Sequence, residues 1–242
     1  MAEKSYYDFA VEPQQVDFTL RVTLPNLITA ILNTAGRDAF GKGFGVDALL
    51  ENDHTWVLSR MAVEINRRPE QYASFRIATW ISDYGRLLST RNFELLDSEG
   101  EVFGRAVTEW AMIDMKSRRA VDLSWVGDAH RDAVVDVPSP IERPRKIREV
   151  AVEEVMEHRV GYSDIDFNRH VNTMRYIDLM FDMLPIELPA LNSPVRCDLH
   201  FMKECRYGQT LSVGCAHRER GASFEIKTDV PYVALRATFD WQ

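Results

Sequence analysis

The sequence contains little cysteine, with only Cys197, Cys205 and Cys215 among 242 residues. The number is odd and no Cys-x-x-C pair occurs, so neither a disulfide framework nor a cysteine-based zinc site is predicted. Unpaired thiols persist in a reducing compartment, which favours a cytoplasmic protein. Long hydrophobic runs are missing as well, and no apolar stretch is long enough to span a bilayer.

Positive charge is also scarce. The chain has 29 Lys and Arg residues against 37 Asp and Glu residues, which gives a formal net charge of −8. A strongly acidic protein is repelled by phosphate backbones and anionic lipid, so we expect neither nucleic acid nor a stable membrane association. The hydrophobic content of 45% is ordinary for a chain with a buried core. The composition therefore fits a soluble enzyme, and it leaves open whether the chain forms a homodimer.

The most informative feature is a cluster of reactive side chains between Asp166 and Asn172. Asp166, Asn168 and His170 occupy alternate positions, and alternate residues of an extended segment project to one side. Asn172 fits the N-cap of a helix that ends before Pro185. The apolar residues of that helix recur at helical spacing: Met174, Ile177, Met180, Phe181 and Leu184. A calcium loop is excluded because the positions that would need glycine and an acid hold Arg169 and Arg175.

The chain is also internally duplicated. Residues 60–68 align without gaps with residues 196–204, at an offset of 196 − 60 = 136, and both segments have the same apolar phase. Residues 105–110 and 236–241 share the pattern Arg-Ala-x-x-acid-Trp, at an offset of 131. Two copies of one structural unit are the simplest account.

Each copy is predicted to contain one long helix followed by four antiparallel strands, which is an α+β fold. The first helix has an apolar stripe from Leu27 to Ala35, begins near Pro25 and ends among glycines 36, 41, 43 and 45. The second helix is expected at about 172–184. The expected strands are 55–67, 72–83, 86–97 and 101–115 in the first copy, and 195–204, 209–219, 222–229 and 232–241 in the second. One further strand is expected before each helix, at 16–23 and 153–162.

Three prolines lie among charged residues between the copies, which is typical of a linker. We therefore divide the chain into an N-terminal domain (1–126), a linker (127–150) and a C-terminal domain (151–242). An apolar helix stripe must be buried, so each helix is expected to be wrapped by its own sheet.

The segment from Val160 to Ile177, followed by residues 201–206, resembles the acyl-ACP thioesterases, which end fatty-acid synthesis. The family pattern is Asp-x-Asn-x-His-Val-Asn-Asn and then Tyr-Arg-Arg-Glu-Cys. This chain departs from it at Thr173 and at residues 201–203, while the polar reactive positions match. The first half also resembles the family's N-terminal signature, through Thr79-Trp80, Arg91-x-Phe93, Asp97-x-x-Gly100, Arg105-Ala106 and Trp110.

The resemblance implies a tandem (double) hotdog fold with one active site per chain. The activity that it implies is hydrolysis of fatty acyl-ACP, with acyl carrier protein as partner and with no metal or redox cofactor. Plant relatives carry a chloroplast transit peptide, whereas this chain begins Met-Ala-Glu-Lys without such a leader, so a bacterial, cytoplasmic member is expected.

The duplication serves as an internal control on the site. The approach to the first helix, residues 21–28, contains no acid or histidine, and Arg68-Pro69 aligns with Glu204-Cys205. If the fold itself required the cluster, both copies should carry it. We therefore predict that Asp166, Asn168, His170 and Glu204 are functional.

Two mechanisms are compatible with these residues. In the first, Glu204 is the general base for water, Asn168 holds that water or the carbonyl oxygen, and Asp166 with His170 orients the carboxamide. In the second, Cys205 attacks, His170 takes its proton and Asn168 fixes the imidazole. The water route is favoured, because the charge of Glu204 opposes a thiolate and strand parity places Cys205 among packing residues. Backbone N–H groups near Asn172 and Thr173 are a candidate oxyanion site.

Two further features follow from the resemblance. The acyl tunnel is expected in the N-terminal copy, with Trp56, Phe75 and Trp80 as candidate wall residues. Acyl carrier protein is acidic, so a local basic patch must attract it; the candidates are Arg67-Arg68, then Lys116 with Arg118-Arg119, then Arg143, Arg145, Lys146 and Arg148 in the linker. The alternatives are an acyl-CoA thioesterase with a nucleotide pocket and a noncatalytic acyl-thioester sensor.

Overall fold

The computed structural model describes residues 3–190, 194–230 and 232–242. In this part of the chain, ten strands form one continuous antiparallel sheet in the order β1-β3-β4-β5-β2-β7-β10-β9-β8-β6. Its N-terminal half contains β1 (Ser5–Ala10), β2 (His54–Ile65), β3 (Ser74–Tyr84), β4 (Ser89–Asp97) and β5 (Val102–Asp114). Its C-terminal half contains β6 (Glu154–Arg159), β7 (Val195–Phe201), β8 (Thr210–Arg218), β9 (Gly221–Thr228) and β10 (Val233–Trp241).

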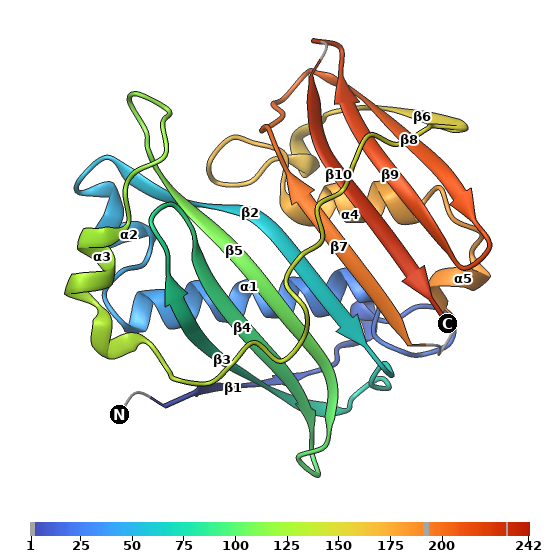
Figure 1. Ribbon diagram of the computed structural model, residues 1–242. Helices are drawn as coiled ribbons and strands as arrows, with labels where there is room; N and C mark the ends of the chain where they lie inside the picture. The colour runs from blue at the N-terminus through green and yellow to red at the C-terminus, as the bar shows by residue number, and fades with distance from the viewer. Residues whose placement is uncertain (1–2, 191–193, 231) are drawn as a thin grey trace.

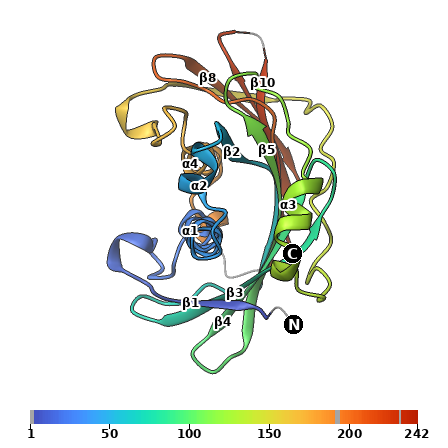
Figure 2. The same ribbon diagram turned by 90° about the vertical axis from the view of Figure 1, so that its left-hand side faces the viewer.

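Two helices lie on the concave side of the sheet, one in each half (Figures 1 and 2). They are α1 (Leu24–Gly41) and α4 (Thr173–Phe181), and the sheet curves around both. The predicted stripe of α1 is buried, and apolar side chains from both halves belong to one core. The shorter helices are α2 (Val46–Leu50), α3 (Ser124–Ala129) and α5 (Glu187–Ala190). The predicted α+β class, with two helices against antiparallel strands, is confirmed.

The duplication is confirmed by the strand registers. Glu64 of β2 lies opposite Arg105, and His200 of β7 lies opposite Arg236. His200 is the residue that the offset of 136 aligns with Glu64, since 64 + 136 = 200. The two alignments that were found separately in the sequence are therefore one structural repeat.

The repeats meet where β2 pairs with β7. Ala62 lies opposite Asp198, which is also its equivalent in the repeat because 62 + 136 = 198. The two halves are thus related by a local twofold axis at this pair. No sheet edge separates them, and the repeats share a sheet as well as a core.

The prediction of a strand at residues 16–23 is wrong. The strand that precedes α1 is β1, which pairs with β3, whereas Val16 and Val22 form an isolated bridge around a tight turn. The turn is closed by a hydrogen bond from the Asp17 N–H to the Arg21 carbonyl, and Leu20 has a φ of +57°. The apolar residues of this segment therefore line a loop. The strand expected at 153–162 is confirmed in a shorter form as β6.

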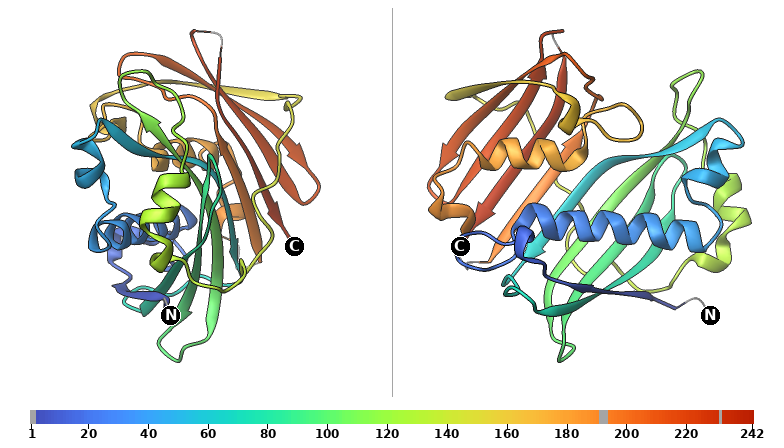
Figure 3. Two further views of the ribbon diagram at one scale, coloured as in Figure 1. Left: turned by 60° about the vertical axis from the view of Figure 1, so that its left-hand side comes forward. Right: turned by 180° about the vertical axis from the view of Figure 1, so that it is seen from behind.

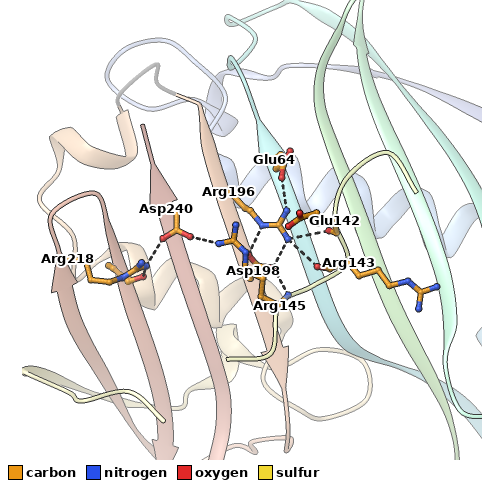
Figure 4. A network of polar contacts seen from close by, with 9 residues as sticks. Glu64, Glu142, Arg143, Arg145, Arg196, Asp198, Arg218 and Asp240 are labelled. Carbon is orange, nitrogen blue, oxygen red and sulfur yellow. Dashed lines mark hydrogen bonds and ion pairs between the residues drawn. The ribbon is translucent and has the colours of Figure 1, made fainter. Parts of the chain in front are cut away.

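The segment between the repeats crosses the outer face of the sheet (Figure 2). After α3 and a short turn, residues 135–153 contain no helix or strand. They are held by a polar network at the β2–β7 junction, drawn in Figure 4. Buried Asp198 accepts the Arg145 N–H at 2.9 Å and the Arg196 Nε–H at 2.8 Å, and Arg196 also binds Glu64 at 2.6 Å. The predicted linker is therefore bound along the sheet. The domain boundary at residue 126 falls within α3 and stays a prediction.

Candidate functional site

A cavity of about 1020 Å³ opens where the two repeats meet. One end is bordered by the loop from Asp166 to Val171 and by residues 201–204 and Arg206 of the C-terminal repeat. The other end extends into the N-terminal repeat between α1 and the sheet, along Leu32, Ala35, Ala39, Trp56, Leu58 and Ile81. A polar mouth thus leads into a largely apolar interior.

Of the three aromatic residues expected at this wall, only Trp56 lines the cavity. Phe75 is in the core, where its ring stacks on Phe9 at 5.3 Å. Trp80 is fully buried, and its indole N–H donates to the Val137 carbonyl at 3.1 Å, under the linker. The alternation of β3 turns Trp80 away from the cavity, and the sequence did not reveal which face the linker covers.

Glu204 lies at the centre of the polar end. Its Oε2 is 3.2 Å from His170 Nε2 and also binds Arg118, and its Oε1 accepts from Arg206 Nη2 at 3.0 Å. The Glu204 and His170 side chains are only 30% and 23% exposed, so this contact is partly shielded from solvent. A carboxylate that contacts an imidazole is an arrangement suited to proton transfer.

Asp166 organises the loop that carries Asn168 and His170. Its Oδ1 accepts the backbone N–H of Asn168 at 2.8 Å and that of His170 at 3.1 Å. Arg169, between them, has a φ of +63°. Asp166, Asn168 and His170 all line the cavity, as does Glu204. The structure therefore brings together four of the five predicted residues.

The internal control used for this cluster is wrong for Asp166. The first repeat has the same loop at an offset of 166 − 17 = 149, where Asp17 Oδ1 accepts the Thr19 N–H at 2.8 Å. The Asp17 N–H donates to the Arg21 carbonyl, as the Asp166 N–H does to the His170 carbonyl. The acid is thus part of the loop fold in both repeats. The offset between these two aspartates is larger than the offset of 136 between the strands, because the helix between loop and sheet is longer in the first repeat.

The remaining positions do differ between the repeats. Arg21 replaces His170, and Arg68 replaces Glu204. Arg68 is buried and binds Asp17 Oδ2 at 2.5 Å, an ion pair that holds the first loop closed. The first repeat thus has Thr19, Arg21 and Arg68 in place of Asn168, His170 and Glu204, and the control still supports a function for these three residues.

Cys205 is the predicted residue that the structure separates from the others. It is fully buried in the core and is not among the residues that line the cavity. Burial raises the pKa of its thiol; the neighbouring Tyr176 hydroxyl opposes this rise, and the charges of Asp229 and Glu204 add to it. The thiolate needed for attack is thus disfavoured. The strand predicted at 195–204 ends at Phe201, and Glu204 lines the cavity while Cys205 is buried in the core.

The start of α4 lies beside the cavity. Asn172 is its N-cap, as predicted, and its side-chain oxygen accepts the Met174 N–H at 3.0 Å. Thr173, the first residue of the helix, lines the cavity. The free N–H groups of a helix start are suited to stabilising a negative oxygen.

The three candidate basic patches lie in different places. Arg68 is buried against Asp17, and Arg67 binds Asp97. The linker cations follow the outer face of the sheet, where Arg145 binds Asp240 at 2.9 Å (Figure 4). Only the loop after β5 reaches the cavity, through Arg118.

Within the described residues, no group of three or more His, Cys, Asp or Glu side chains is arranged to hold a metal ion. In the same residues, no helix is both long and apolar enough to cross a membrane.

Comparisons with known proteins agree on one family. Residues 3–125 match the acyl-ACP thioesterase N-terminal domain, and residues 147–242 match the C-terminal domain of the same family. The chain is 30% identical over 209 residues to acyl-[acyl-carrier-protein] hydrolase FATB3, chloroplastic, of Cuphea viscosissima, a match that covers 81% of this chain and 50% of that protein. It is 27% identical over 218 residues to the chloroplastic oleoyl-acyl carrier protein thioesterase of Coriandrum sativum, covering 82% and 58%. The chain thus spans about half the length of the curated relatives it matches.

Among solved structures, an acyl-ACP thioesterase from Bacteroides thetaiotaomicron is similar with a TM-score of 0.90 and 36% identity, covering 99% of this chain and 98% of that one. The 12:0-ACP thioesterase of Umbellularia californica is 18% identical with a TM-score of 0.85, over 99% and 97% of the two chains, and it supports the fold alone. The predicted double hotdog fold is confirmed.

We expect Asp166→Asn to keep most activity and Asp166→Ala to lose it. Asparagine retains a side-chain oxygen that can accept the two backbone N–H groups, whereas alanine leaves the loop unsupported. A misplacement of about 1 Å in the attached groups can cost on the order of 100-fold in rate. The measurement is kcat for thioester hydrolysis by both variants. An equally large loss in both would mean that the carboxylate charge itself takes part in the reaction.

Proposed function

Since the chain belongs to the acyl-ACP thioesterase family, we propose that it hydrolyses fatty acyl-[acyl-carrier-protein]. The products are free fatty acid and holo-ACP, so the reaction ends fatty-acid synthesis. The observation that carries this proposal is the cavity, which joins the His170–Glu204 pair to a largely apolar interior. An acyl chain can occupy that interior while its thioester lies at the polar mouth.

In the proposed reaction, Glu204 accepts a proton from water while the water oxygen attacks the thioester carbonyl carbon. A carboxylate has about four acceptor positions, so Glu204 can bind this water in addition to its cationic partners. Collapse of the tetrahedral intermediate breaks the C–S bond, and the proton passes to the leaving thiolate. Water supplies both the hydroxyl of the acid and the hydrogen of the thiol, so no further reactant is consumed.

The other residues have supporting roles in this proposal. His170, 3.2 Å from Glu204, receives and returns the proton. Asn168 binds the water or the carbonyl oxygen. Asp166 holds Asn168 and His170 in place by accepting their backbone N–H groups. The N–H groups at the start of α4, near Thr173, are suited to the developing oxyanion. Cys205 is a packing residue here, because it is buried and its pKa is raised.

We assign the acyl tunnel to residues 1–126 and the catalytic residues to residues 151–242, with 127–150 as the connection. We place the docking of acyl carrier protein at the cavity mouth, on Lys116 and Arg119 of the loop after β5; Arg118 of the same loop binds Glu204 instead. The three cysteines are free and buried, which supports a reducing location such as the cytoplasm of a bacterium.

The proposal predicts faster hydrolysis of acyl-ACP than of the matching acyl-CoA. The measurement is thiol release from both series with acyl chains of graded length, as kcat/KM. Faster hydrolysis of acyl-CoA would support thioester hydrolysis but contradict acyl carrier protein as the partner, as expected for an acyl-CoA thioesterase. Tight binding without turnover would assign the protein to the noncatalytic acyl-thioester sensors.

The two mechanisms are separated by Glu204→Gln and Cys205→Ser. We expect the first to lower kcat by about 100-fold or more, because a general base contributes about 10²–10⁴. The second should retain activity within a few-fold, since serine replaces a packing residue. Far-UV circular dichroism of both variants controls for folding. The reverse order of effects would make Cys205 the nucleophile.

Gly36→Leu should shift the preference of the enzyme toward shorter acyl chains. Gly36 lines the cavity, and a Cβ added there meets nothing within 4 Å, so a larger side chain can enter the cavity without disturbing α1. Each methylene that loses its buried site costs about 0.8 kcal/mol. The measurement is the chain-length profile of kcat/KM. Gly41→Leu is the matched control, because it also has free space but is not among the cavity residues.

A further inference from the structure

Arg118 reaches the site from the other repeat. It belongs to the loop that joins β5 to α3, and this loop projects at the same end of the molecule as the loop that leads into α4 (Figure 3). Its guanidinium binds Glu204 Oε2, which is the same oxygen that faces His170 Nε2. Glu204 is therefore contacted by one cation from each repeat, Arg118 and Arg206, and by His170.

Hydrogen bonds fix the backbone conformation of the turn that contains Arg118. Arg118 has a φ of +58°, a conformation that non-glycine residues rarely adopt. The turn is closed by hydrogen bonds from the Arg118 N–H to the Asp114 carbonyl at 2.8 Å and from the Asp114 N–H to the Arg119 carbonyl at 3.0 Å. Its base is fixed by the Met115 N–H, which donates to the Asp53 carbonyl at 2.7 Å. Backbone strain of this kind persists where the surrounding structure fixes the residue, often at functional sites.

The two cations act on different oxygens. Arg206 is two residues from Glu204, is 65% exposed and binds Oε1. Arg118 is 44% exposed and binds the oxygen that shares the contact with His170. Of the two arginines, Arg118 therefore binds the carboxylate oxygen that contacts the imidazole, at the polar end of the cavity.

We propose that Arg118 is a positioning residue of the reaction: its guanidinium holds Glu204 Oε2 against His170. The inference rests on the proposed hydrolysis. With this role for Arg118, the active site contains residues of both repeats, although all the predicted catalytic residues lie in the second repeat.

The test is Arg118→Gln, with kcat and KM measured separately for an acyl-ACP substrate. We expect kcat to fall by about 100-fold, the low end of what an acid–base group contributes, with KM changed less than about threefold. A loss confined to kcat is expected because Glu204 keeps its contacts with Arg206 and His170 in the variant but loses the cation on Oε2.

Two further variants distinguish positioning from a general structural effect. Arg118→Lys should recover part of kcat, and added guanidinium should restore activity to Arg118→Ala, because the partly exposed site admits a small cation. Arg67→Gln is the matched control: it removes an ion-paired arginine of 45% exposure that is remote from the cavity, and it should change neither parameter.

Unchanged kcat in Arg118→Gln, or a rise in KM alone, would overturn the positioning role while leaving hydrolysis intact. If the wild type did not hydrolyse acyl-ACP at all, the proposed function itself would be contradicted.

Discussion

The pairing of β2 with β7 determines most of what this molecule can do. It joins two repeats, each too small to enclose a long cavity, into one sheet that curves around both helices. The pairing is antiparallel and centred on Ala62 and Asp198, so the loops of one repeat are brought to the helix of the other. The cavity, whose mouth belongs to the second repeat and whose interior belongs to the first, is a direct consequence.

The two repeats use one loop for different purposes. Its backbone hydrogen bonds are duplicated, including the aspartate that accepts N–H groups within the turn, Asp17 in one repeat and Asp166 in the other. In the first repeat, Asp17 and Arg68 form a buried ion pair, which satisfies both charges and keeps the loop closed. In the second, Glu204 contacts His170 at the cavity, where a proton acceptor is accessible to a substrate. Divergence of a few side chains on a common scaffold thus separates a loop closed by an ion pair from a loop that lines the cavity.

The residues of the cluster therefore fall into two groups, those that both repeats share and those that occur in one repeat only. Asp166 is needed wherever the loop is built, whereas Asn168, His170 and Glu204 occur in one copy only. Arg118 belongs with the second group although it lies in the first repeat. A site assembled across the β2–β7 junction depends on the relative placement of the repeats, and the network of Arg196, Asp198 and Arg145 holds that placement from the outer face (Figure 4).

The sequence alone determined the class of fold and the chemical centre of the site. Periodicity placed α1 and the four strands that follow each long helix, because an apolar stripe and strand alternation are local properties. The duplicated Arg-Ala-x-x-acid-Trp pattern located equivalent strands for the same reason. The spacing of Asp166, Asn168 and His170, with the resemblance of residues 160–177 and 201–206, identified the residues that converge on the cavity.

Only the tertiary structure decided which of these residues share an environment. The turn at residues 17–21 has the composition of a strand, and hydrogen bonds across the loop close it. Trp56 belongs to β2 and lines the cavity, whereas Trp80 lies on the face of β3 that the linker covers. Residue type alone does not distinguish the two. Arg118 and Glu204 are 86 residues apart, and their contact exists because pairing of β2 with β7 sets one repeat beside the other. Contacts of this kind depend on the path of the whole chain, which no local pattern encodes.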